Sequence, residues 1–222
     1  MNRRMFLCLA LVLSGCQVHE ESHTNAIQHD RRKYVVAILM DTSGSFQSLM
    51  FGQDGRAYEF CMETAKDFRE EIGDDGTVLL AQLSGNDDPL LWEGTPQQLM
   101  SSFSSAENLR DFIRSKSDPN ASRLFGGLAD AMAYLRGVSG PDTILCVVVL
   151  TDLIDNSPTQ KEDRKRLVEE LRRFNKPQNC IGMYYLATKE MQVCRELFAE
   201  AGLDGAAEGK IVHKPKRLVF GR

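Results

Sequence analysis

The chain has 222 residues, 42% of them hydrophobic and 26% charged, which is enough for one globular domain with a substantial core. Lys and Arg number 27 against 31 Asp and Glu, giving a formal net charge of −4 at pH 7. A nucleic-acid-binding protein would carry an excess of Lys and Arg residues clustered on its surface, so this composition argues against nucleic acid as a partner. The short basic runs at 31–33 and 214–222 are interpreted as solvated flanks.

Residues 1–15 have the pattern of a secretory signal peptide. Arg3 and Arg4 precede a short apolar stretch, Met5–Leu13, which is too short to span a bilayer. The stretch ends in Leu-Ser-Gly-Cys16, which resembles the lipobox of bacterial lipoproteins. This resemblance implies cleavage before Cys16, acylation of its thiol, and contact with the membrane through the lipid anchor only. The resemblance also implies the outer membrane, facing the periplasm, because a residue other than Asp, here Gln17, follows the cysteine.

Residues 16–33 are polar and lack apolar periodicity, so they are predicted to be a flexible tether to a domain spanning 34–213. Within that domain, 34–40 is an almost unbroken apolar run, typical of a strand covered on both faces. Helical periodicity follows over 57–72, and Gly73 ends that helix. Residues 77–83 and 89–92 are predicted strands of a hairpin, and Ser105 is a predicted N-cap of a short helix.

The second half continues the alternation of strands and helices. We predict helices at 122–135, 161–174 and 191–201, strands at 143–150 and 180–186, and a short edge strand at 211–212. Alternation at this spacing predicts an α/β fold with a doubly wound, mostly parallel sheet, one antiparallel edge strand, and helices on both faces.

Four cysteines, at 61, 146, 180 and 194, lie inside the predicted domain. Cys146 sits within an apolar run and is expected to be a buried thiol. A strand from 180 and a returning helix would leave Cys180 and Cys194 ~15 Å apart, against a limit of ~7 Å for a disulfide. We therefore predict no bridge between these two, and leave other pairings open.

Polar residues follow the two fully apolar strands. Asp41, Ser43 and Ser45 come after the first strand, and Thr151 and Asp152 come after the second. In an open α/β sheet, ligands bind at the carboxyl ends of strands near the switch point. Two carboxylates converging there would repel each other, and a cation between them resolves this repulsion. Hydroxyl and carboxylate oxygens suit Mg²⁺.

The Asp-x-Ser-x-Ser pattern at 41–45 resembles the metal-binding motif of von Willebrand factor type A (vWA) domains. Family members also place a threonine before a helix reading roughly T-x-L-x-x-x-L, and an aspartate in a strand-terminal Thr-Asp. The matching segments are Ser122–Leu128 and Thr151–Asp152. The resemblance therefore covers residues 34 to about 213.

The resemblance implies a metal-ion-dependent adhesion site that holds Mg²⁺, with Mn²⁺ or Ca²⁺ as alternatives. The hydroxyls of Ser43, Ser45 and Ser122 would bind the ion, and Asp41 and Asp152 would act mainly through waters. An open position would take a carboxylate from an unidentified partner protein. The sequence departs from the family in having Ser122 in place of threonine, and Leu153 where glycine is common.

Three other functions compete with this prediction of a non-catalytic binding module. A metal-independent structural scaffold in envelope assembly or secretion fits the same sequence. A phosphatase-like hydrolase would need a second carboxylate at position 43, which is serine, and a nucleophile–base pair that the sequence does not supply. An ATPase accessory role conflicts with the predicted location outside the cytoplasm.

Overall fold

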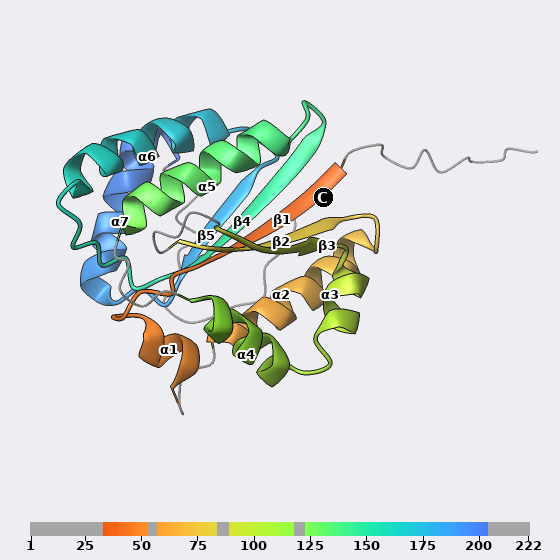
Figure 1. Ribbon diagram of the computed structural model, residues 1–222. Coiled ribbons are helices and arrows are strands. Elements are labelled where there is room, and N and C mark those ends of the chain that lie inside the picture. Colours follow the sequence, from red (N-terminus) through yellow and green to blue (C-terminus); the bar gives the residue numbers. More distant parts are fainter. Residues whose placement is uncertain (1–32, 53–56, 84–88, 118–122, 204–222) are drawn as a thin grey trace, which may run out of the picture. The chain divides into compact units, whose positions relative to one another are not determined.

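The computed structural model describes residues 33–52, 57–83, 89–117 and 123–203, drawn in colour in Figure 1. The predicted signal peptide, the tether as far as residue 32, Cys16, Ser122, the edge strand at 211–212 and the basic tail lie outside these residues. The described residues belong to one of two compact units, Arg31–Arg222. None of the helices within the described ranges is long and apolar enough to cross a membrane.

Five strands form one sheet in the order β3-β2-β1-β4-β5. Their bounds are β1 Lys33–Met40, β2 Thr77–Gln82, β3 Leu90–Gly94, β4 Thr143–Leu150 and β5 Cys180–Tyr184. All neighbouring pairs are parallel except β2 and β3, which form the antiparallel pair at one edge. The predicted fold class is therefore confirmed: a mostly parallel α/β sheet with one antiparallel edge strand.

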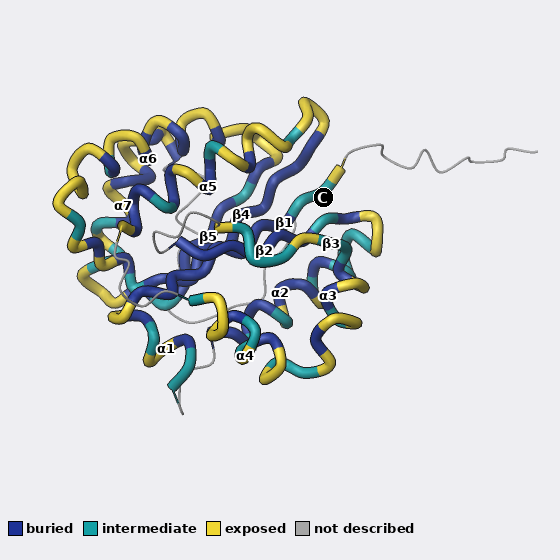
Figure 2. Tube along the Cα trace, viewed as in Figure 1, coloured by how far each residue is buried: buried dark blue, intermediate teal, exposed yellow. Residues whose placement is uncertain are grey.

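Helices cover both faces of this sheet (Figure 1). On one face lie α1 Gln47–Phe51, α2 Ala57–Ile72, α3 Pro96–Ser102 and α4 Ala106–Lys116; on the other lie α5 Leu124–Val138, α6 Gln160–Phe174 and α7 Thr188–Ala201. Alternate residues of β1 and β4 point to opposite faces, so each strand contributes to two cores. Figure 2 shows the central strands as almost continuously buried, which explains their unbroken apolar sequence.

Local signals account for the helix ends. Ser105 caps α4 by accepting a hydrogen bond from the Asn108 amide, as predicted. Gly73 after α2 and Gly202 after α7 have φ of 93° and 75°, a conformation that glycine adopts without a Cβ clash. Helix α3 was not predicted, although Thr95 and Gln98 form a reciprocal capping box at its start. The short helix α1 was not predicted either.

One cysteine prediction is wrong and one is confirmed. Cys146 is not a free thiol, because it forms a disulfide with Cys180, with the two Cα atoms 4.6 Å apart. These residues are register partners on β4 and β5, so the sheet itself brings them into bonding range. Cys194 is free and buried, as is Cys61, which agrees with the absence of a 180–194 bridge.

Candidate functional site

The predicted metal-binding residues that the structure describes lie at the carboxyl edge of the two central strands. Met40 and Leu150 are register partners, so Asp41 and Thr151 leave the sheet side by side. The Asp41 amide donates to the Leu150 carbonyl at 2.8 Å, which extends the pairing by one residue. The structure thus brings the Asp41 and Thr151–Asp152 segments together, as the sequence predicted.

Asp41 organises the loop that follows β1. Its Oδ1 accepts a hydrogen bond from the Ser43 amide at 2.9 Å, and its Oδ2 accepts one from the Thr151 hydroxyl at 2.9 Å. Ser43 in turn accepts hydrogen bonds from the Phe46 and Gln47 amides at the start of α1. Asp41 is 1% exposed and Ser43 5%, so this turn is held firmly at the sheet edge.

The two described serine hydroxyls have a spacing that suits a bound cation. Ser43 Oγ and Ser45 Oγ lie 3.1 Å apart, and either can donate to the other. Neighbouring ligands of an octahedral Mg²⁺ at about 2.0–2.1 Å from the metal would be roughly 3 Å apart. No cluster of three or more His, Cys, Asp or Glu side chains able to hold a metal occurs among the described residues.

The electrostatics of Asp41 also suit a cation. Burial raises the pKa of the Asp41 carboxyl above its ordinary value, hydrogen bonds from Ser43 and Thr151 lower it, and repulsion from Asp152 raises it again, with a net upward shift. The influence of Asp152 on the pKa of Asp41 is the repulsion predicted from the sequence. A nearby cation would favour the charged form of the Asp41 carboxyl.

Asp152 and the residue after it shape the second loop. Asp152 Oδ1 accepts a hydrogen bond from the Ile154 amide at 3.1 Å, and the Thr151 hydroxyl accepts one from the Leu153 amide at 2.8 Å. Leu153 has φ of 60°, the left-handed conformation that leucine rarely adopts. The glycine common at this position in the resembled family would adopt it freely. Leu153 keeps it because its side chain is 4% exposed and packs in the core.

This conflict predicts an unusual order of stability for two variants at position 153. Leu153→Ala loses buried side-chain atoms and keeps the backbone strain, at a cost of about 2–4 kcal/mol. Leu153→Gly loses these atoms and Cβ as well, but it relieves strain of about 1–2 kcal/mol, so it should be the more stable of the two. Urea denaturation measures both. At Leu150, buried in an extended strand, glycine should instead be worse than alanine; the same order at both positions would contradict this account.

The start of α5 lies beside the loop that follows β4, since the Phe125 amide donates a hydrogen bond to Asp155. Gly127 lets α5 pass close to the end of β2, since a Cβ there would lie 2.0 Å from the Leu83 carbonyl oxygen. Arg123, the first described residue after position 122, pairs with Asp163 of α6 through two hydrogen bonds of 2.8 Å. The chain that follows Ser122 is therefore tied to α6, whereas Ser122 itself lies outside the described residues.

Two residues of this edge were missed as functional candidates. Thr151 was read only as part of the Thr-Asp match, yet its hydroxyl links Asp41 to the Leu153 amide. Asp155 is 6% exposed and accepts hydrogen bonds from the Phe125 amide at 2.7 Å and the Ser157 amide at 2.8 Å. It therefore caps α5 from a distant loop, and no local sequence signal indicates this contact.

This chain is similar to known proteins in structure and not in sequence. No family model matches the sequence, and no curated protein sequence matches it either. The PilB minor pilin from Streptococcus sanguinis is similar in structure, with 16% identity, a TM-score of 0.56, and coverage of 85% of this chain and 58% of the pilin. The SpRpn10 VWA domain follows with 13% identity, a TM-score of 0.51, and coverage of 78% and 85%. The fold is that of a von Willebrand factor type A domain.

The pilus adhesin SpaC from Lactobacillus rhamnosus GG shares this vWA-like architecture, at 11% identity and a TM-score of 0.54. The match covers 84% of this chain but 29% of SpaC, so the chain spans less than two thirds of both the pilin and the adhesin. At these identities the likeness shows the vWA-like fold alone.

Proposed function

We propose that this protein is a non-catalytic binding module that holds a partner protein through a divalent metal at the edge of its vWA-like domain. The ion is Mg²⁺, or Mn²⁺ or Ca²⁺ in its place. The residues that would hold it are Asp41, Ser43, Ser45, Ser122 and Asp152. The partner would present an acidic side chain at this edge.

The observation that carries the proposal is the pair of serine hydroxyls 3.1 Å apart on a turn fixed by Asp41. Ser43, Ser45 and Ser122 would hold the ion as neutral ligands, and Asp41 keeps Ser43 in place through its amide. When bound, the metal supplies an electrophilic centre that accepts a carboxylate. The loops around Ser45 and Asp152 orient the partner.

The structural neighbours support an interaction module, since they include a minor pilin, a pilus adhesin and a VWA domain. A specific observation also favours the metal-independent scaffold as a second candidate. Both oxygens of Asp41 have partners within the chain, so the carboxylate braces the fold without any ion. Chelation separates the two, because only the metal-dependent module loses its partner in EDTA.

The metal site is tested by replacing Ser122, the proposed ligand that lies outside the described residues. We expect Ser122→Ala to weaken Mg²⁺ binding by about tenfold or more while leaving the fold intact, because it removes one hydroxyl from a loop. Isothermal titration calorimetry of the metal-free protein measures this affinity. Ser101→Ala is the matched control, since Ser101 is exposed on α3. Equal affinities in the two variants would exclude Ser122 from the site.

We also propose that the protein is anchored in the bacterial cell envelope through an acylated Cys16, at the outer membrane facing the periplasm. The disulfide between Cys146 and Cys180 supports a location outside the cytoplasm, because such bonds persist in oxidising compartments.

Mass spectrometry of the purified protein tests the anchor. The N-terminal peptide should begin at Cys16 and carry the mass of the attached lipid. An unmodified peptide that spans Ser14 through Gln17 would disprove acylation.

A further inference from the structure

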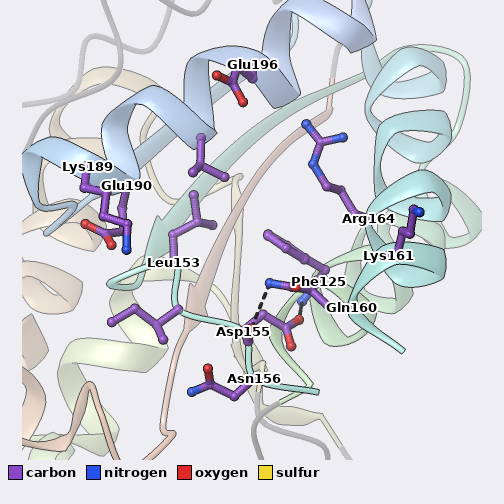
Figure 3. A pocket seen from close by; sticks show the side chains of 12 residues that line it. Phe125, Leu153, Asp155, Asn156, Gln160, Lys161, Arg164, Lys189, Glu190 and Glu196 are labelled. Carbon is purple, nitrogen blue, oxygen red and sulfur yellow. Dashed lines mark hydrogen bonds between the residues drawn. The ribbon is translucent and has the colours of Figure 1, made fainter. Parts of the chain in front are cut away.

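A cavity of about 630 Å³ lies next to the proposed metal site, between the N-terminal halves of α6 and α7. Figure 3 shows Leu153 and Phe125 at its centre, with Arg164 and Lys161 of α6 on one side and Lys189 and Glu190 of α7 on the other. Its volume falls within the range of about 300–1,000 Å³ typical of ligand pockets. The apolar residues that line it are Phe125, Leu153, Ile154 and Val193, and Asn156 and Gln160 are its polar uncharged residues.

The cavity is continuous with the loop that carries Asp152. Leu153 and Ile154 line the cavity and are the next two residues of the chain, and the Ile154 amide is bonded to Asp152 Oδ1. Ile154 is 38% exposed, and it lies two residues after Asp152 of the proposed metal site.

The charges around the cavity favour an uncharged occupant. Asp155 is satisfied by the Phe125 and Ser157 amides, and Arg164 is paired with Glu200 through hydrogen bonds of 2.8 and 2.6 Å. The remaining charged residues of the lining are of both signs: Lys161, Lys189, Glu190 and Glu196. A ligand of either sign would meet like charge as well as opposite charge, whereas a neutral apolar group gains from the apolar surface.

We infer that the partner places a bulky apolar side chain in this cavity, on the same segment that presents its carboxylate to the metal. This inference rests on the proposed function and specifies the partner's chemistry. Consecutive Cα atoms are about 3.8 Å apart, so the cavity wall begins within about two residues of Asp152. An extended partner segment would therefore bridge the two positions with about one to three intervening residues. The apolar side chain acts as the anchor, and the carboxylate fixes orientation.

Synthetic peptides with blocked termini test this arrangement on the full-length protein. Each peptide contains one aspartate and one tryptophan separated by one, two or three residues, and companion peptides replace the tryptophan by alanine or the aspartate by asparagine. Dissociation constants come from the shift of the Ile154 methyl resonance in Mg²⁺ and in EDTA. For at least one spacing, the change from tryptophan to alanine should weaken binding about tenfold or more.

Two protein variants assign that effect to the cavity. Val193→Trp fills the cavity, and Val138→Trp is the matched control on α5, where Val138 is 55% exposed and does not line it. The tryptophan preference should fall below about twofold in Val193→Trp and persist in Val138→Trp, with Mg²⁺ affinity unchanged in both.

The outcomes separate the inference from the proposed function. A tryptophan preference that persists in Val193→Trp, or no measurable binding by any peptide, overturns the inference. If the aspartate and Mg²⁺ matter but tryptophan does not, the proposed function stands and the inference fails. If the tryptophan preference depends on Val193 but Mg²⁺ and aspartate have no effect, the cavity binds an apolar side chain and the metal-dependent function fails.

Discussion

Asp41→Asn should abolish the rise in melting temperature that Mg²⁺ gives the wild-type protein. A metal that binds only the folded state adds about 2.7 kcal/mol of stability at a hundredfold excess over its dissociation constant. Asparagine keeps the shape of Asp41 and can still accept a hydrogen bond from the Ser43 amide, but it removes the charge that favours the cation. Thermal melts of both proteins in EDTA and in millimolar Mg²⁺ measure the difference.

In EDTA, Asp41→Asn should be as stable as the wild type at neutral pH, or more stable. Burial raises the pKa of Asp41 in the folded state above its ordinary value of 3.8. At pH values between 3.8, the pKa of Asp41 in the unfolded chain, and its higher pKa in the folded state, the folded protein binds more protons than the unfolded chain. The stability of the wild type therefore falls as the pH rises through this range. Asparagine does not titrate, so the variant escapes this loss.

Asp155→Asn is the matched control, because Asp155 is also a buried aspartate that accepts two backbone hydrogen bonds. This variant should lose stability in EDTA and still gain stability from Mg²⁺. If Asp41→Asn behaves in the same way, Asp41 is only a structural brace and the metal-dependent function is wrong at its central residue.

Replacing both bridged cysteines, as Cys146→Ala with Cys180→Ala, should lower the free energy of unfolding by about 3–4 kcal/mol. The disulfide closes a loop with a sequence separation of 34, and it restricts the unfolded chain by about this amount. The loop contains α6, so β4, α6 and β5 are expected to lose stability together. Urea denaturation under non-reducing conditions measures the loss.

Two controls isolate the bond from the side chains. Dithiothreitol should destabilise the wild type by a similar amount and leave the double variant unaffected. Cys61→Ala removes a buried cysteine that is not in a disulfide, and so measures the cost of the missing sulfur alone. A double variant that loses no more than Cys61→Ala would show that the bridge contributes nothing to stability.

The sequence by itself determined the architecture, because local patterns report local burial. The apolar runs of β1 and β4 required helices on both faces of the sheet. The helical period of its apolar residues predicted α2, and the N-cap at Ser105 predicted the start of α4. The same patterns placed Asp41 and Asp152 after adjacent strands, so the position of the candidate site was predictable. The signal for α3 was equally local, in Thr95 and Gln98, and was overlooked.

Tertiary structure alone decided the contacts between distant segments. The hydrogen bond from Thr151 to Asp41 joins residues 110 positions apart in the sequence, and the bond from the Phe125 amide to Asp155 joins residues 30 apart. No periodic pattern in the sequence indicates either contact. Cys146 looked like an ordinary apolar residue, because its pairing with Cys180 depends on the register of β4 against β5. The approach of distant loops and the pairing of one strand with another depend on how the whole sheet packs, whereas a local sequence pattern reports which residues of a single strand or helix are buried or capped.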